Sequence, residues 1–186
     1  MSLIQKSSLP MWATYSRILL TPVIMVTLSA SFRHAEWIAG ILFIVASMTD
    51  WLDGYLARTL NAESNMGKFM DPIADKILIL GCLLILLDMH RVGPWPVALL
   101  LGRDIYIGGL RSVAAANNII ISAKPLGKWK TALQMVSLPC LFIYDSNLPI
   151  PFVTIGTWLL WGAVVLSLIS GFEYMVGYHR NRDSKV

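Results

Sequence analysis

The sequence has 186 residues, of which 56% are hydrophobic and only 14% are charged. Because an average soluble domain carries about 25% charged residues, this composition disfavours a soluble globular protein, and the length allows one domain rather than two large ones. The excess of Lys and Arg gives a net charge of +4. These cations gather near the ends of apolar segments, so we expect anionic membrane lipids or a phosphorylated substrate as partners, and no nucleic acid.

Six apolar segments follow one another along the chain, each close to the ~20 residues that a membrane-spanning helix needs. They cover residues 9–30, 37–58, 69–87, 94–116, 128–144 and 152–177. The pattern shows no strand-like alternation, and only helices or closed barrels span a bilayer. We therefore predict an all-α fold, a polytopic membrane protein with six transmembrane helices that forms a single membrane-embedded domain over residues 1–186.

The polar regions between these segments differ in charge. One set, which includes both chain ends and the polar stretches 59–68 and 117–130, contains Lys6, Arg58, Lys68, Lys124, Lys128, Lys130, Arg180, Arg182 and Lys185. The other set contains Arg33 and Arg91. Because positively charged loops stay on the cytoplasmic side, the sequence predicts a multi-pass protein of the cell (inner) membrane. Both termini and the two polar stretches would face the cytoplasm.

Aspartates recur at helical spacing where the second segment ends and the third begins. The second segment carries Asp50, Asp53, Gly54 and Ala57 at positions i, i+3, i+4 and i+7. The third carries Gly67, Asp71 and Asp75 at positions i, i+4 and i+8. Each set shares one helix face, and a connection of about ten residues favours antiparallel neighbours. We therefore expect the four carboxylates to gather in one small volume.

Carboxylates gathered in this way need neutralisation, because a single Asp costs about 2.5–3.5 kcal/mol at the centre of a membrane helix. One solution is a network of ion pairs with Arg58, Lys68 and Lys76. The other is metal, since ligation by oxygen alone suits Mg²⁺ or Mn²⁺ and disfavours Zn²⁺. Four carboxylates suffice for two ions about 3.5–4 Å apart, the spacing of two-metal phosphoryl-transfer sites. The small residues on the same faces leave room for a ligand, and Arg58 is placed to reach a phosphate.

Eight residues at fixed spacing resemble the complete signature of the CDP-alcohol phosphatidyltransferase family. They are Asp50, Asp53, Gly54, Ala57, Arg58, Gly67, Asp71 and Asp75. The six-helix core of that family agrees with the segment count, so the resemblance covers essentially the whole chain. Similarity to members that use glycerol 3-phosphate is carried by Leu9, Pro10, Thr14, Arg17, Leu110, Arg111 and residues 126–135. Two positions depart from many relatives, with Met11 in place of Asn and Asp104 in place of Glu.

The resemblance implies a transferase of phospholipid biosynthesis. CDP-diacylglycerol would donate its phosphatidyl group to glycerol 3-phosphate, giving phosphatidylglycerol phosphate and CMP. The resemblance further implies two Mg²⁺ ions, with Mn²⁺ as the alternative, bound by Asp50, Asp53, Asp71 and Asp75, and it makes Asp75 the general base as well. The donor site would be formed by Pro10, Thr14, Gly54, Ala57, Arg58, Ser64 and Gly67. A homodimer is compatible with this interpretation.

The phosphate of the acceptor requires cations of its own, and the candidates are Arg103, Arg111, Lys128 and Lys130. The two arginines lie inside an apolar helix, where charged residues are costly and usually functional. The two lysines open a segment on the predicted cytoplasmic side, where contact with lipid headgroups is an alternative. An alternative role for Asp104 is an ion pair with Arg111, seven residues further on. Arg17 is a further candidate as a buried partner of the aspartates.

Three alternatives remain open at this stage. A sibling enzyme that transfers to serine, inositol phosphate or a second phosphatidylglycerol would share the same aspartate signature. A membrane prenyltransferase also uses Asp-rich diphosphate sites, but usually has two such motifs in a longer chain. A cation transporter or channel built around intramembrane carboxylates would be favoured by inverted repeats, and we find none in the sequence.

Overall fold

The computed structural model describes residues 3–59, 65–116, 125–144 and 149–183, without the side chains of residues 3–13, 50–59, 65–72, 115, 125, 179 and 181–183. The described residues form helices and no strand. The helices are α1 (Leu3–Ser29), α2 (Ala35–Thr59), α3 (Asn65–Asp88), α4 (Pro94–Ala116), α5 (Pro125–Phe142) and α6 (Phe152–Asp183). Each predicted apolar segment corresponds to one of them, which confirms the all-α prediction.

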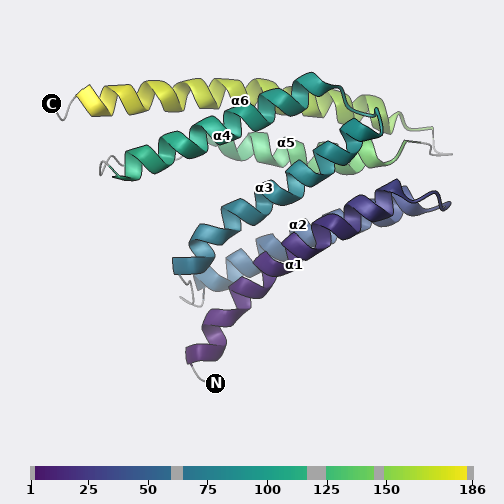
Figure 1. The fold of residues 1–186 in the computed structure, drawn as a ribbon, viewed down its shortest axis with the longest axis horizontal. Coiled ribbons are helices and arrows are strands. Elements are labelled where there is room, and N and C mark those ends of the chain that lie inside the picture. Colours follow the sequence, from purple (N-terminus) through teal and green to yellow (C-terminus); the bar gives the residue numbers. More distant parts are fainter. Residues whose placement is uncertain (1–2, 60–64, 117–124, 145–148, 184–186) are drawn as a thin grey trace.

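Consecutive helices alternate in direction through an elongated bundle (Figure 1). The end of α2 and the start of α3 therefore lie toward the same end of the bundle as the start of α1 and the end of α6. Helix α3 packs against α1, α4 and α5, and it joins the α1–α2 pair to the group formed by α4, α5 and α6. The expected ten-residue connection before α3 is wrong in length. Helix α2 continues to Thr59 and α3 begins at Asn65, so only residues 60–64 lie between them.

Helix α3 ends in a Schellman motif, which sets the direction of the chain after it. His90 adopts a positive φ of 60°, a conformation that is uncommon for a residue with a side chain. Its N–H donates to the carbonyl oxygen of Leu87 at 3.0 Å, and the N–H of Arg91 donates to that of Leu86 at 2.9 Å. Pro94 then opens α4, where the absence of an N–H removes no helical hydrogen bond. This turn moves Arg91 away from the axis of α3.

Apolar side chains from all six helices meet in one core. Phe43 of α2 and Phe142 of α5 make an edge-to-face contact within it, with ring centroids 5.7 Å apart. Two glycines set the closest helix approaches. A Cβ at Gly81 would lie 2.5 Å from Cγ2 of Thr21, and one at Gly156 would lie 2.7 Å from Cγ of Leu141. Helices α1 and α3, like α5 and α6, therefore approach to a distance that only glycine permits.

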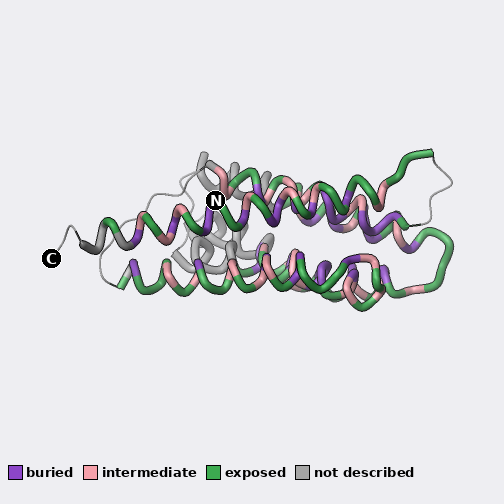
Figure 2. Tube along the Cα trace, turned by 90° about the horizontal axis from the view of Figure 1, so that it is seen from above, coloured by how far each residue is buried: buried purple, intermediate pink, exposed green. Residues whose placement is uncertain are grey.

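Buried and exposed residues alternate along each helix, and large apolar side chains cover much of the outer surface as well (Figure 2). Examples are Leu19, Val26, Trp95, Ile105 and Trp158, each more than two thirds exposed. Extensive exposed apolar surface marks contact with membrane or protein. Within the described residues, one helical stretch, Phe152–Tyr178, is by itself both long and apolar enough to cross a membrane. The six-span topology therefore stays a prediction.

A half-buried ion pair connects helices at the end of the bundle that contains the α3–α4 turn. Nη2 of Arg91 lies 2.5 Å from Oε1 of Glu36, near the start of α2, and Nη1 donates to the carbonyl oxygen of Phe142 at the end of α5. The second carboxylate oxygen of Glu36 accepts from the N–H of Tyr144 at 2.8 Å. The guanidinium of Arg91 also lies over the ring of Tyr144, 5.0 Å from its centroid. We call these four residues the Arg91 cluster.

Candidate active site

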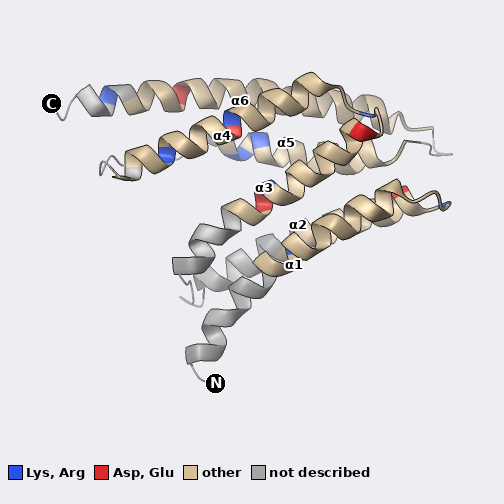
Figure 3. Ribbon diagram, in the orientation of Figure 1, with Lys and Arg blue, Asp and Glu red and all other residues tan. Residues whose placement is uncertain are grey.

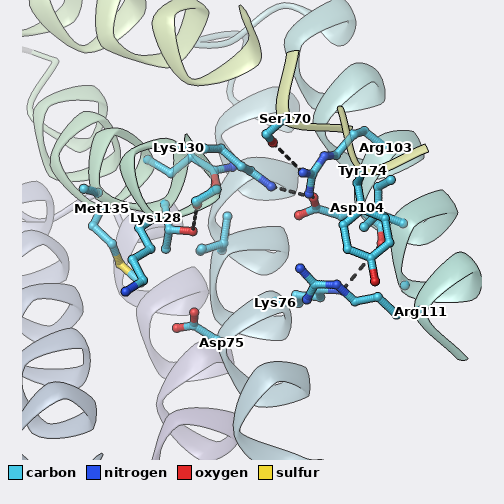
Figure 4. Close-up of a pocket in the computed structure, with 17 residues that line it drawn as sticks. Asp75, Lys76, Arg103, Asp104, Arg111, Lys128, Lys130, Met135, Ser170 and Tyr174 are labelled. Carbon is cyan, nitrogen blue, oxygen red and sulfur yellow. Dashed lines mark hydrogen bonds and ion pairs between the residues drawn. The ribbon is translucent and has the colours of Figure 1, made fainter. Parts of the chain in front are cut away.

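A cavity of about 550 Å³ opens between α3, α4, α5 and α6 (Figure 4). Its charged lining consists of Asp75, Lys76, Arg103, Asp104, Arg111, Lys128 and Lys130. Basic residues outnumber acidic ones, so the lining carries a surplus of positive charge that suits an anionic ligand. We call this cavity the cation pocket. It brings Asp75 together with all four residues predicted from the sequence to bind the acceptor's phosphate.

Arg103 is held by hydrogen bonds that run from α4 to α6. Its Nε donates to the carbonyl oxygen of Ser167 at 3.0 Å, and its Nη2 donates to the hydroxyl of Ser170 at 2.6 Å. Its Nη1 lies 3.0 Å from Oδ1 of Asp104. The side chain lies close along α6, because a Cβ at Gly171 would stand 3.2 Å from Cγ and Nε of Arg103. This guanidinium is therefore a fixed part of the pocket lining.

Asp104 pairs across helices with Lys130, whose Nζ lies 2.5 Å from the carboxylate oxygen Oδ1. Lys130 is buried, with 4% of its surface exposed. The ion pair with Arg111 that the sequence allowed as an alternative is therefore wrong. Seven residues along a helix separate two side chains by about 10 Å along its axis, whereas Lys130 reaches Asp104 from the adjacent α5. The carboxylate thus balances part of the charge of Arg103 and Lys130.

Arg111 and Lys128 are held differently from the other two cations. Both are exposed, and within the described residues neither forms an ion pair with a carboxylate. The guanidinium of Arg111 instead lies over the ring of Tyr174 on α6, with its central carbon 5.2 Å from the ring centroid (Figure 4). These two side chains consequently keep their charge and their N–H donors available to a ligand in the pocket.

Asp75 lies beside a buried arginine of α1. Nη1 of Arg17 lies 3.6 Å from Oδ1 of Asp75, which confirms Arg17 as a buried partner of the aspartates. Arg17 is 1% exposed, and Thr14, one turn earlier on α1, is also buried. The carboxylate keeps 28% of its side-chain surface exposed and faces the cation pocket. It is therefore fixed on one side and accessible on the other.

For most of the remaining predicted residues, the structure describes the backbone but not the side chain. The side chains of Pro10, Asp50, Asp53, Gly54, Ala57, Arg58, Gly67 and Asp71 are not described, and neither is Ser64. The backbone places Asp50, Asp53 and Asp71 on α2 and α3, near the ends that residues 60–64 connect. Among the described residues, no three of the types His, Cys, Asp and Glu come together as a metal-binding group. The metal-ligand set therefore stays a prediction for all four aspartates.

Several pocket residues were not predicted from the sequence. Ser170 and Tyr174 come from α6, and Thr131, Gln134 and Met135 come from α5. Residues 131–135 follow directly after the predicted Lys128 and Lys130. The helical period therefore gave a weak indication that some of them lie near the pocket. The two residues of α6 lie more than 60 positions beyond Arg103 in a segment that is apolar on most sides. No spacing rule within one helix connects them to α4.

The aspartate spacing, the helical bundle and the cation pocket together agree with one known class of enzymes. The chain belongs to the CDP-alcohol phosphatidyltransferase family, whose model matches residues 7–169. The match covers α1 from residue 7 onward, α2 to α5 completely, and about half of α6. It makes the protein a phosphatidyltransferase by family.

Three individual relatives show which members of the family the chain resembles. The chain is 38% identical over 181 residues to the CDP-diacylglycerol–glycerol-3-phosphate 3-phosphatidyltransferase of Bacillus subtilis, covering 90% of this chain and 93% of the relative. It is 37% identical to the enzyme of the same name from Rickettsia bellii, with the same coverage. It is also 34% identical to the cardiolipin synthase (CMP-forming) of Oryza sativa, of which it covers 56%. The first two relatives match along nearly their whole length.

Proposed function

We propose that this protein transfers the phosphatidyl group from CDP-diacylglycerol to glycerol 3-phosphate, giving phosphatidylglycerol phosphate and CMP. The observation that carries the proposal is the cation pocket, which places Asp75 beside a surplus of basic side chains. Breaking the donor's diphosphate needs cations near the scissile bond alone. A second basic cluster beyond Asp75 suits an acceptor that carries its own phosphate. Whole-length relatives named for glycerol 3-phosphate support the same acceptor.

In the proposed reaction Asp75 is the general base. Its carboxylate takes the proton of the acceptor's primary hydroxyl, whose oxygen attacks the phosphorus that bears diacylglycerol. The bond from that phosphorus to the oxygen of the CMP phosphate then breaks, and CMP leaves with the bonding electron pair. Nη1 of Arg17 lies 3.6 Å from Oδ1 of Asp75, within ion-pair distance of the carboxylate. Proton transfer to a positioned base is worth about 10²–10⁴-fold in rate.

The acceptor's phosphate is assigned to Arg111 and Lys128, two exposed cations of the pocket that form no ion pair with a described carboxylate. Hydrogen bonds between a guanidinium and a phosphate are charge-assisted and directional. Arg103 and Lys130 share the carboxylate of Asp104, so they shape the pocket and contribute less net charge. We further propose that Pro10, Thr14, Gly54, Ala57, Arg58, Ser64 and Gly67 hold the donor.

We further propose that Asp50, Asp53, Asp71 and Asp75 hold the divalent metal that would bind the donor's diphosphate. The donor set is all oxygen, which suits Mg²⁺, with Mn²⁺ as the alternative. Two such ions when bound would neutralise charge on the diphosphate and the leaving CMP. Turnover should stop in EDTA and return when Mg²⁺ is added back. Full turnover in EDTA would remove the metal from the proposal while leaving the acceptor assignment in place.

We also propose that all six helices span the cell membrane, with the cation pocket open to the cytoplasm. The exposed apolar residues on the outer faces of the bundle support a lipid environment. The unequal distribution of Lys and Arg between the two sets of polar regions supports the orientation. Labelling single cysteines introduced at Arg33 and at Arg180 from either side of a sealed vesicle tests it. Labelling of both positions from the same side would overturn it.

A screen of acceptor alcohols tests the proposed function. Purified full-length protein receives labelled CDP-diacylglycerol with glycerol 3-phosphate, glycerol, serine, inositol phosphate or phosphatidylglycerol, and the lipid product is identified. Glycerol 3-phosphate should give the fastest CMP release, and phosphatidylglycerol phosphate should be the product. Phosphatidylglycerol is the main competing acceptor, because a sibling enzyme that uses this lipid would share the aspartate signature. Faster turnover with that lipid, or with serine, would place the protein in a sibling branch.

A further inference from the structure

Arg111 is held over an uncharged ring, and this distinguishes it from the other cations of the pocket. Arg103 and Lys130 lie against the carboxylate of Asp104. The contact of Arg111 is with Tyr174, at 5.2 Å from the ring centroid. A carboxylate would cancel the charge of the guanidinium and use its N–H donors. The face of an aromatic ring attracts the cation through its quadrupole and does neither.

An arginine without such a contact would be poorly placed for binding. Its side chain is long, and fixing it in one rotamer costs conformational entropy. Arg111 is exposed to the pocket and has no hydrogen bond or ion pair among the described residues that would select one rotamer. Tyr174 is 9% exposed, and a buried aromatic side chain is a rigid support. The ring of Tyr174 therefore restricts the side chain of Arg111 to one position, which no hydrogen bond or ion pair among the described residues does.

We propose that Tyr174 is a positioning residue for the acceptor, which acts by holding Arg111 in the pocket with its charge and donors available. This inference rests on the proposed function, because it takes the acceptor's phosphate as the anion that Arg111 binds. It assigns a role to a residue beyond position 169, where the match to the family ends. The ring, and not the phenolic hydroxyl, is the part that acts.

Five variants of the full-length protein test this role. Tyr174→Phe keeps the ring and removes the hydroxyl, whereas Tyr174→Leu removes the ring. Tyr178→Leu is the matched control, because Tyr178 lies one turn further along the same helix, is similarly buried, and packs against Ala114 of α4 outside the pocket lining. Arg111→Ala, alone and combined with Tyr174→Leu, shows whether Tyr174 acts through Arg111.

The measurement is the KM for each substrate in CMP release. Tyr174→Leu should raise the KM for glycerol 3-phosphate by about threefold to tenfold, the loss of one cation–π contact, and change that for CDP-diacylglycerol by less than twofold. Tyr174→Phe and Tyr178→Leu should stay within about twofold of wild type for both. In the Arg111→Ala background, Tyr174→Leu should add no further rise. Because KM does not depend on the amount of active enzyme, partial misfolding lowers only the maximal rate.

Other outcomes separate the possible failures. If Tyr174→Phe matches Tyr174→Leu, the hydroxyl is responsible and the inference is overturned. The same holds if Tyr178→Leu gives an equal rise, if both substrates are affected alike, or if the effect persists without Arg111. If wild-type protein does not use glycerol 3-phosphate, the proposed function fails first and this inference falls with it.

Discussion

Buried or half-buried arginines are held in two regions of the molecule, and the regions differ in how many carboxylates accompany them. In the Arg91 cluster one guanidinium faces one carboxylate, and the remaining contacts run to a backbone carbonyl and an aromatic ring. The cation pocket is lined by five basic side chains and only two aspartates. Figure 3 shows the two groups of charge well separated along the bundle. The charges of Arg91 and Glu36 balance each other in the first region, whereas the described residues of the second region have an excess of positive charge.

The difference teaches how to distinguish a structural ion pair from a binding site in an apolar bundle. Taking two charges out of water costs several kcal/mol each, and their attraction offsets this only when the geometry is good. The Arg91 cluster meets that condition, and it connects α2, the α3–α4 turn and α5. The pocket retains charge that its own residues do not balance. An anion from outside the protein is the simplest complement.

The largest expected effect is on the carboxylate of the pocket. Asp75→Asn should lower turnover by at least about 10²-fold, because an amide cannot take the proton of the acceptor hydroxyl. CDP-diacylglycerol binding should persist. Glu36→Gln, which removes a carboxylate from the Arg91 cluster, should leave turnover per folded molecule close to wild type. CMP release at saturating concentrations of both substrates measures this. Retention of more than a tenth of the wild-type rate by Asp75→Asn would require another base.

The second expected effect is on stability and falls on the balanced region. Arg91→Met leaves the carboxylate of Glu36 without its cation, and we expect a loss of about 2–3 kcal/mol in unfolding free energy. This lies below the roughly 3–5 kcal/mol of fully buried pairs, because the side chains of Arg91 and Glu36 stay 11% and 22% exposed. Arg111→Met should cost little, since it strands no carboxylate. Thermal unfolding in detergent compares the two, and equal losses would contradict the contrast between the regions.

The third expected effect is on acceptor binding. Arg111→Ala should raise the KM for glycerol 3-phosphate by about tenfold or more, as expected for the loss of hydrogen bonds to a charged group. The KM for CDP-diacylglycerol should change much less. Arg91→Ala is the comparison, and it should leave both KM values unchanged in the protein that folds. An equal rise for both substrates in Arg111→Ala would place this arginine at the donor instead.

The helices and much of the pocket were predictable from sequence because both depend on local signals. Apolar lengths near 20 residues define the helices, and charges inside apolar helices are costly enough to indicate function, which singled out Arg103 and Arg111. The pairing of Asp104 was not predictable, since its partner comes from a different helix. Tyr174 was also missed, because its contact with Arg111 depends on how α4 and α6 pack. Such side-chain contacts depend on how different helices pack together, and the residue spacing within one helix does not predict this.

The smallest expected effect concerns the glycine beneath Arg103. A Cβ at Gly171 would lie 3.2 Å from both Cγ and Nε of Arg103. The arginine would have to move by a few tenths of an ångström while it stays bonded to Ser167, Ser170 and Asp104. We expect the contact with Arg103 to cost Gly171→Ala about 1 kcal/mol of stability, the lower end of overpacking costs, which offsets the gain in helix propensity. We also expect the KM for glycerol 3-phosphate to rise about two- to threefold.

Gly177→Ala provides the matched control for this change. It lies on the same helix, and nothing stands within 4 Å of the position that its Cβ would occupy. Alanine is a better helix former than glycine by about 1 kcal/mol, so Gly177→Ala should keep or raise the unfolding temperature and leave KM unchanged. The same gain in helix propensity applies to Gly171→Ala, so any difference between the two variants isolates the contact with Arg103. If the two variants behave alike, Arg103 can move without cost. The pocket would then need the positive charge of Arg103 but not its fixed position.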